Sequence, residues 1–291
     1  MPTEQEFYAG KTIVISGAAS GIGRALAEVF ASYGAHLALC DKDSSLLNEV
    51  SKFLMSTTTP DRVFTYTMDV ANNEAWQDFI QQAHSKYNNI DVCINNAGIE
   101  GTSSPVWASD MATLERVMEV NFYGVVHGTR TVLPYLIDRP WAAIVNVSSI
   151  FGMIGAANAA DYCASKFAVR GFTEAFRAEL TEIHPHIQIQ LVHPGGIATN
   201  IARRDNSQSF KQKFLTTAPK DIAEHIANRV MRNRARIVYG NQSAIVHVAS
   251  RLLPLNWLAR LVGMQVRQLG MQNDYRTDHP GFHMPNKKGT K

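Results

Sequence analysis

Cysteine, long apolar runs and an excess of either charge are all scarce in this sequence. Its 291 residues include three cysteines, Cys40, Cys93 and Cys163, and their wide spacing matches neither a disulfide framework nor a metal site. We therefore expect no metal and a reducing compartment. No uninterrupted apolar run is long enough to cross a bilayer, and residues 1–10 lack the apolar core of a signal peptide. These absences favour a soluble, cytoplasmic protein.

Charge is nearly balanced, with 28 Lys and Arg residues against 25 Asp and Glu and a formal net charge of +3. No block of lysine and arginine runs through the body of the chain, so the sequence does not indicate nucleic-acid binding. A hydrophobic content of 45% and a charged content of 18% are ordinary for globular proteins. The length suits one large α/β domain or two small ones.

Seven short runs rich in β-branched and apolar residues indicate strands, and helical patterns separate them. The expected strands are residues 12–16, 36–40, 63–68, 91–94, 142–147, 187–192 and 236–239. Strands that alternate with helices, without hairpin signals between them, are typical of βαβ units. We therefore predict an α/β fold whose doubly wound parallel sheet has about seven strands and helices on both faces. Residues 1–240 are expected to form a single domain.

A glycine-rich turn follows the first expected strand and opens a helix. It reads Gly17-Ala18-Ala19-Ser20-Gly21-Ile22-Gly23. Glycines let the backbone approach a pyrophosphate, and the N-terminus of a helix offers free N–H groups to it. The spacing is Gly-x-x-x-Gly-x-Gly, not the Gly-x-Gly-x-x-Gly of the most common dinucleotide fold. A tight turn that only packs the helix on the strand is the alternative, but the flanking strand and helix favour a cofactor site.

Asp41 stands at the end of the second expected strand. A carboxylate at that point, about 20 residues past the glycine turn, can accept hydrogen bonds from both ribose hydroxyls of NAD. It would repel the 2′-phosphate of NADP. The turn adds no basic residue to neutralise such a phosphate, and Lys42 is the one ambiguous neighbour. Asp41 could alternatively cap the helix expected over residues 43–54. We expect NAD as the cofactor and keep NADP as the alternative.

Polar or glycine-bearing segments follow several other strands at the point where each ends. Asp69-Val70 follows the third strand, Asn95-Asn96-Ala97-Gly98 the fourth, Ser148-Ser149 the fifth, and Pro194-Gly195-Gly196-Ile197-Ala198-Thr199 the sixth. In an open parallel sheet, ligands bind outside the carboxyl ends of the strands. These segments are therefore expected to border one crevice. Asp69 could instead cap the helix that begins near Asn72.

Tyr162 and Lys166 are four residues apart in a helix expected to continue to about Ile183, so their side chains share one face. A phenol has a reference pKa of roughly 10. A neighbouring ammonium lowers that pKa toward the range useful for acid–base chemistry. The spacing alone occurs by chance in many helices. Asn121 lies among apolar residues in a helix expected over residues 111–133, where asparagine is mildly unfavourable.

Taken in order and at their spacing, these segments resemble the short-chain dehydrogenase/reductase family over roughly residues 8–240. The match includes the glycine turn, with Ser16 where threonine is usual, and the Asn-Asn-Ala-Gly run. It implies a Rossmann-like fold and NAD(P)-dependent interconversion of an alcohol and a carbonyl compound. The implied catalytic residues are Asn121, Ser149, Tyr162 and Lys166, and the implied cofactor contacts are Gly17, Ser20, Gly21, Ile22, Gly23, Asp41, Asp69, Val70, Asn96, Ala97, Gly98, Tyr162, Lys166, Pro194, Gly195, Ile197 and Thr199.

The resemblance also implies a role for each catalytic residue. Ser149 would hold the substrate oxygen and Tyr162 would transfer the proton. Lys166 would hold the nicotinamide ribose and, together with the positive charge of the oxidised cofactor, lower the pKa of the phenol. Asn121 would hold a water that links Lys166 to solvent. Enoyl reductases of the superfamily space their Tyr and Lys more widely, so alcohol–carbonyl chemistry is expected. A homodimer or homotetramer through the helices that hold Asn121 and Tyr162 is also implied.

Two further hypotheses compete with an NAD-dependent enzyme. An NADP-dependent carbonyl reductase would use Lys42 to meet the phosphate. A non-catalytic cofactor-binding scaffold or sensor on the same fold would have a broken site, whereas here all four implied catalytic residues are present.

Substrate specificity is expected to come from three segments that follow strand ends, residues 100–107, 150–158 and 196–215. The second is apolar and uncharged, and the third carries Phe210 and Phe214 on an expected mobile lid. We therefore expect a small-molecule substrate, a lipophilic or bulky alcohol or ketone. Ordinary core packing explains these apolar residues about as well.

Residues 241–271 extend past the family's minimal chain. Two amphipathic helices are expected, over residues 245–253 and 255–269, with a break at Pro254. The second places its apolar side chains on one stripe, namely Leu258, Leu261, Val262, Val266 and Leu269. We favour a helical flap on the core or a subunit contact, with peripheral contact to a membrane surface as the alternative. The tail over residues 272–291 is expected to be disordered.

Overall fold

The computed structural model describes residues 2–201 and 208–268 and confirms the predicted α/β fold. Within that part of the chain, seven parallel strands form one sheet in the order β3-β2-β1-β4-β5-β6-β7. They are β1 (Thr12–Ser16), β2 (His36–Asp41), β3 (Val63–Thr67), β4 (Val92–Asn95), β5 (Ala142–Val147), β6 (Ile187–Pro194) and β7 (Arg236–Tyr239). The chain builds outward from β1 to β3 and then returns to β4. The strand order therefore reverses between β1 and β4, which is where ligands bind in such sheets.

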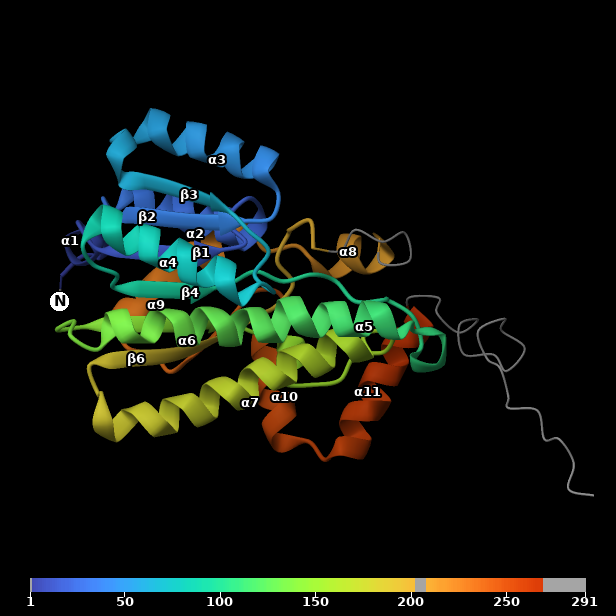
Figure 1. The fold of residues 1–291 in the computed structure, drawn as a ribbon. Helices are drawn as coiled ribbons and strands as arrows, with labels where there is room; N and C mark the ends of the chain where they lie inside the picture. Colours follow the sequence, from blue (N-terminus) through green and yellow to red (C-terminus); the bar gives the residue numbers. More distant parts are fainter. Residues whose placement is uncertain (1, 202–207, 269–291) are drawn as a thin grey trace, which may run out of the picture.

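Helices cover both faces of the sheet (Figure 1). They are α1 (Glu4–Tyr8), α2 (Gly21–Ser32), α3 (Ser44–Thr57), α4 (Asn73–Tyr87), α5 (Met111–Met118), α6 (Gly124–Leu136), α7 (Ala160–Ile183), α8 (Gln208–Phe214), α9 (Pro219–Met231), α10 (Ser243–Leu252) and α11 (Leu255–Gln268). Short 3-10 turns add η1 (Pro60–Arg62), η2 (Val106–Ala108) and η4 (Ile150–Gly152). The core residues of α2 and α9 form one apolar cluster with the sheet, and those of α4 and α6 form another.

Strand β1 shows why the strand sequences are continuously apolar. Ile13 and Ile15 belong to the cluster that contains α2 and α9, whereas Val14 belongs to the cluster that contains Trp76 and Phe79 of α4. Successive side chains of a strand point to opposite faces. Because both faces of this sheet are covered by helices, every residue of the strand must be compatible with burial.

The helix expected over residues 111–133 is interrupted, which corrects that prediction. A π-helical segment, Glu119–Tyr123, separates α5 from α6. A π turn inserts one residue into a helix and is frequent at functional sites. Here the segment carries Asn121, which is fully buried and hydrogen-bonded to the backbone of Ile99. Helical periodicity in the sequence does not reveal such an insertion.

The C-terminal extension forms the two expected helices, α10 and α11, and confirms the break at Pro254. Helix α10 packs against β7 and against η4, the turn directly after Ser149. The stripe expected on the second helix is not wholly buried, because Leu258 and Val262 are half-buried while Leu261 is exposed. Residues 272–291 lie outside the described part of the chain. Among the described helices, none has the length and apolar character needed to cross a membrane.

Candidate active site

The glycine turn adopts a conformation that its glycines require. Gly17 has a φ of +67° and Gly21 a φ of +55°, in the left-handed region that favours glycine. A Cβ on Gly17 would also lie only 2.8 Å from Cα of Ala97, at the end of β4. The turn therefore presses its backbone against the Asn-Asn-Ala-Gly run. This close approach is the arrangement expected of a loop that holds a pyrophosphate.

Side chains from β1 and β4 lock the two segments together. The Ser16 hydroxyl accepts hydrogen bonds from the backbone N–H groups of Asn96 and Ala97, at 3.1 and 3.2 Å. The Asn96 side chain donates back to the carbonyl oxygens of Ser16 and Gly17, at 3.0 and 3.2 Å. The Ser16 hydroxyl thus accepts both of the hydrogen bonds donated by the backbone of the Asn-Asn-Ala-Gly run. Ser20, Gly21 and the rest of the first turn of α2 begin directly beside this junction, and Ser20 makes no capping bond of its own.

Asp41 contacts the glycine turn rather than capping a helix. One carboxylate oxygen accepts from the backbone N–H of Ala19 at 3.0 Å, and the other accepts from Asp43 N at 3.0 Å. The N-cap of α3 is Asp43, whose side chain accepts from the N–H of Leu46. The alternative in which Asp41 caps that helix is therefore wrong. Its position at the tip of β2 is the one from which a ribose would be reached.

Asp69 is also not the cap of the next helix, because Asn72 caps α4. One oxygen of Asp69 accepts from the N–H of Ala71, and the other pairs with the guanidinium of Arg116 on α5. No sequence pattern singled out Arg116, which comes from a segment 47 residues away along the chain. Contact between Asp69 and an adenine remains a prediction.

The sixth strand ends beside the glycine turn. Gly195 N donates to the carbonyl of Tyr239 at 2.7 Å, which fixes the turn after β6 to the end of β7. A Cβ on Gly21 would meet Cγ2 of Thr199 at 3.1 Å. Thr199 and the glycine turn are therefore neighbours, although Thr199 and Gly21 are 178 positions apart in the sequence. Ile197 is buried in the apolar cluster that contains α2 and α9.

Asn121 and Lys166 approach Gly98 together. A Cβ on Gly98 would lie 3.3 Å from both Asn121 Oδ1 and Lys166 Nζ. Asn121 Oδ1 accepts from Ile99 N at 2.8 Å, and its Nδ2 donates to Ile99 O and to Ser165 Oγ, both at 3.1 Å. These bonds hold the π segment, the end of β4 and α7 in one cluster. The role of Asn121 in holding a water remains a prediction.

Ser149, Tyr162 and Lys166 form the reactive end of this cluster. The hydroxyl of Ser149 is hydrogen-bonded to the phenol of Tyr162. Lys166 Nζ lies 5.6 Å from the centre of the Tyr162 ring and donates to the carbonyl of Val147 at 3.1 Å. The ring of Phe151 meets that of Tyr162 edge to face, with centroids 6.4 Å apart. The structure thus brings together the serine, tyrosine and lysine that the sequence singled out.

Burial is the largest influence on the pKa values of Tyr162 and Lys166. Burial raises the pKa of Tyr162 to about 12, and the hydrogen bond with Ser149 only partly opposes this increase. Burial also lowers the pKa of Lys166 to about 8. Both shifts have one cause, because removal from water disfavours the charged form of each group. Tyr162 is therefore a neutral phenol near pH 7, ready to donate its proton.

His193, which no sequence pattern singled out, forms a hydrogen bond with the backbone of Ser149. Its Nδ1 lies 2.8 Å from the carbonyl oxygen of Ser149, so Nδ1 carries the proton and donates it. Burial lowers the pKa of His193 to about 4, which keeps the ring neutral near pH 7. The only available signal was its position directly before the Pro194-Gly195 turn.

The N-terminus of α7 is tied to the first expected specificity segment. The buried carboxylate of Asp161 accepts from Thr102 N at 2.6 Å and from Tyr162 N at 2.7 Å. Residues 100–107 are therefore anchored next to the catalytic tyrosine. In the third segment, Phe214 is buried at the end of α8, and its carbonyl accepts from Asn241 Nδ2 at 3.0 Å. The side chain of Phe210 lies outside the described part.

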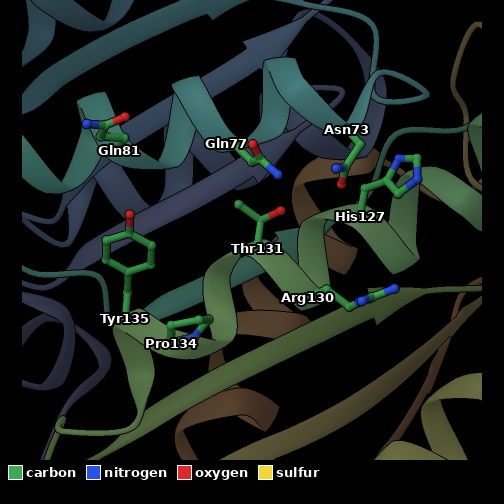
Figure 2. A pocket seen from close by; sticks show the side chains of 8 residues that line it. All are labelled: Asn73, Gln77, Gln81, His127, Arg130, Thr131, Pro134 and Tyr135. Atoms are coloured by element: carbon green, nitrogen blue, oxygen red, sulfur yellow. The ribbon is translucent and has the colours of Figure 1, made fainter.

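A surface cavity of about 590 Å³ lies elsewhere, between α4 and α6 (Figure 2). Its lining is mostly polar and consists of Asn73, Gln77, Gln81, His127, Arg130, Thr131, Pro134 and Tyr135. None of these residues belongs to the site described above. A second cavity, of about 400 Å³, includes Asp69 and Arg116. Among the described residues, no cluster of His, Cys, Asp and Glu could hold a metal ion.

Comparison with known proteins assigns this arrangement to a family. The short chain dehydrogenase family matches residues 11–209. The oxidoreductase SadH of Mycobacterium tuberculosis is 36% identical over 256 residues, which cover 84% of this chain and 92% of that protein. Dehydrogenase/reductase SDR family member 7B of Bos taurus is 32% identical over 267 residues, covering 88% of this chain and 81% of the relative.

A solved structure gives the same result. The crystal structure of a short chain dehydrogenase/reductase from Burkholderia phymatum, in complex with NAD, superposes with a TM-score of 0.78 at 26% identity. The match covers 84% of this chain and 93% of that one. The seven-stranded parallel sheet described above agrees with this likeness of fold. The chain therefore belongs to the short-chain dehydrogenase/reductase family of oxidoreductases.

Proposed function

We propose that this protein is an NAD(P)-dependent oxidoreductase that interconverts a secondary alcohol and a ketone, or an alcohol and an aldehyde. The observation that carries the proposal is the cluster in which Ser149, Tyr162 and Lys166 meet beside Gly98. These residues come from the end of β5 and from α7, and the glycine turn lies on the other side of Gly98 and Ala97. The acid–base residues therefore lie next to the glycine turn, whose backbone is suited to binding a dinucleotide.

The residues present fit a nicotinamide dinucleotide. The first turn of α2 supplies N–H groups for the pyrophosphate, and a side chain at Gly17 would block the approach. Asp41 would accept from the ribose hydroxyls, Lys166 would hold the nicotinamide ribose, and residues 194–199 would border the nicotinamide. The bound cofactor would supply or accept the hydride. The NAD in the Burkholderia phymatum relative supports this assignment.

In the reductive direction, the neutral phenol of Tyr162 donates its proton to the carbonyl oxygen as hydride reaches the carbon. The Ser149 hydroxyl donates a hydrogen bond to the same oxygen and holds it beside the phenol. In the oxidative direction, Tyr162 must first lose its proton, and it then takes the hydroxyl proton of the alcohol. The charge of Lys166 favours that phenolate. General acid–base catalysis of this kind contributes about 10²–10⁴-fold to a rate.

A lipophilic or bulky substrate is the class that the loops favour. Phe151 lies against the Tyr162 ring, and Ile150 and Met153 in the same segment are buried and apolar. The segment over residues 150–157 has no charged side chain to bind an ionic substrate. A cytoplasmic location and a homodimer or homotetramer remain predictions.

Replacement of Tyr162 by phenylalanine tests the proposal. Tyr162→Phe removes the transferable proton and keeps the ring, so turnover of secondary alcohols should fall by about 10³-fold or more while NADH binding is retained. Turnover is measured by NADH appearance across alcohols of graded size, and binding by NADH fluorescence. Tyr66→Phe, at a half-buried tyrosine on β3, is the matched control. Near-normal turnover in Tyr162→Phe would refute the assignment, and absence of turnover in the wild-type protein would favour a non-catalytic scaffold.

The second candidate is an NADP-dependent carbonyl reductase. The observation in its favour is Lys42, whose side chain is exposed next to Asp41 and is free to approach a 2′-phosphate. The two candidates share every catalytic residue. They differ in the relative affinity for NADH and NADPH.

A further inference from the structure

The C-terminal hairpin, which we define as α10, α11 and the turn between them, exposes an unusual amount of apolar surface. On α10, Ile245, Val248 and Leu252 are exposed at positions i, i+3 and i+7, which lie on one helix face. On α11, Trp257, Leu261 and Met264 are exposed at positions i, i+4 and i+7, which also lie on one helix face. Leu253 in the turn and Leu255 at the start of α11 are also exposed, the latter by 79%. Large apolar side chains exposed together in this way mark interaction sites in soluble proteins.

The hairpin is placed so that this surface is accessible. Helix α10 packs against β7, and in Figure 1 the turn between α10 and α11 lies at the lower edge of the molecule. Ser243, at the start of α10, is buried, whereas Leu252 at its end is 74% exposed. The hairpin is thus packed on the protein at the start of α10 and exposed to solvent at the turn.

The charged residues of the hairpin itself are all of one sign. Between Glu224 and Asp274 the sequence contains no aspartate or glutamate, and it contains seven arginines. Arg251 and Arg260 are exposed and flank the apolar turn. No carboxylate from the hairpin itself can neutralise them. A partner with negative charge is therefore favoured electrostatically.

We propose that this hairpin docks on the surface of an anionic phospholipid bilayer. The apolar side chains of the turn would enter the boundary between headgroups and acyl chains, while Arg251 and Arg260 would contact lipid phosphates. Trp257 suits this depth because tryptophan concentrates at membrane interfaces. The contact is peripheral, as neither helix is able to span a bilayer.

Charge argues against a second copy of the chain as the occupant. Two hairpins that packed face to face would bring their arginines together without any acidic residue to balance them. A bilayer with anionic lipids instead offers an apolar interior to the exposed apolar side chains and negative charge to the arginines. Because α10 also packs on η4, the docked surface would lie close to the loop that follows Ser149. Docking of this kind requires neither turnover nor a particular substrate.

Vesicle co-sedimentation of the full-length protein tests the proposal. Vesicles of phosphatidylcholine with phosphatidylglycerol should bind the wild-type protein about tenfold or more better than vesicles of phosphatidylcholine alone. The triple change Leu252→Ser, Leu255→Ser and Trp257→Ser should lower binding by about tenfold or more. Changing Arg251 and Arg260 to Gln should lower it by about fivefold per arginine, and only for the anionic vesicles.

Ile183→Ser is the matched control, because Ile183 is also exposed, at 67%, but lies at the C-terminal end of α7. It should bind vesicles as the wild type does. Thermal melting by circular dichroism checks that each variant is folded, and the arginine variants provide an independent test if the apolar variant is unstable. No binding of the wild type, or equal binding to both vesicle types, would overturn the proposal. So would a hairpin variant that breaks a dimer, measured by size-exclusion chromatography, without changing vesicle binding.

Discussion

At the scale of single residues, desolvation controls the chemistry of this site. The same burial raises the pKa of the Tyr162 phenol to about 12 and lowers that of the Lys166 ammonium to about 8. In the proposed reaction, these values favour proton donation by Tyr162 near neutral pH. Oxidation needs the phenolate and should therefore become faster as the pH rises. His193 shows the same effect in a group that holds the backbone of the site.

The buried imidazole predicts an acid-sensitive stability. His193 has a pKa of about 4 in the folded protein against the ordinary histidine value of 6.5, so the unfolded chain binds a proton that the folded protein does not bind between these pH values. Stability is therefore present above pH 6.5 and is lost as the pH falls toward 4. The loss attributable to His193 is about 3 kcal/mol.

The variant His193→Asn keeps a donor near the position of Nδ1 and removes the titration. Its free energy of unfolding, measured by urea denaturation at several pH values, should decline less than that of the wild type below pH 6.5. His186→Asn is the control, since this histidine lies near the surface, where its ring contacts the carbonyl of Ile137 and the ring of His184. An unchanged pH slope in His193→Asn would show that other groups cause the acid sensitivity.

At the scale of elements, the site depends on the junction of β4, the π segment and α7. Asn121 bonds both to Ile99 and to Ser165, so it connects the three elements. Gly98 lies against the side chains of Asn121 and Lys166. An α-helix without the π insertion would rotate Asn121 away from this junction by about 100°, the angle between successive residues.

Gly98→Ala is predicted to disturb this junction without unfolding the protein. The new Cβ would lie 3.3 Å from both Asn121 Oδ1 and Lys166 Nζ, which is closer than ordinary van der Waals contact. Displacing Lys166 by a few tenths of an ångström should lower kcat by about tenfold, because reaction rates depend steeply on position. Gly155→Ala is the matched control, as nothing lies within 4 Å of its Cβ. Equal kcat values for the two variants would contradict the role of the junction.

At the scale of the whole molecule, the sheet order collects distant segments at one edge. The ends of β1, β2, β4, β5 and β6 contribute to the site because parallel strands point their carboxyl ends the same way. A cofactor bound across these ends would hold several elements together. Its binding should therefore be visible as a change in the stability of the whole protein.

Thermal stabilisation by the two cofactors should distinguish the two candidate functions. NADH should raise Tm more than NADPH at equal concentration, since Asp41 repels a 2′-phosphate. Asp41→Ala should reduce or abolish the difference. Asp43→Ala is the matched control, because Asp43 caps α3 and should cost about 1 kcal/mol of stability without altering the preference. A larger shift with NADPH in the wild-type protein would favour the NADP-dependent reductase.

The sequence by itself determined the features that depend on local order. Short apolar runs and helical periods predicted the strands and helices, because burial on both faces constrains each residue of a strand. Glycine spacing predicted the cofactor turn, and the four-residue gap between Tyr162 and Lys166 placed both on one helix face. Each of these features depends only on neighbouring residues and steric rules.

Only the tertiary structure decided the features that depend on burial and on long-range contact. The pKa of Tyr162 is raised because burial disfavours the charged phenolate, and the sequence alone does not show how deeply a side chain is buried. The contacts of Arg116 with Asp69 and of His193 with Ser149 join residues more than 40 positions apart. The π segment and the exposed face of the C-terminal hairpin likewise depend on what packs nearby. Periodicity shows that a helix has an apolar side, but the rest of the molecule decides whether that side is covered.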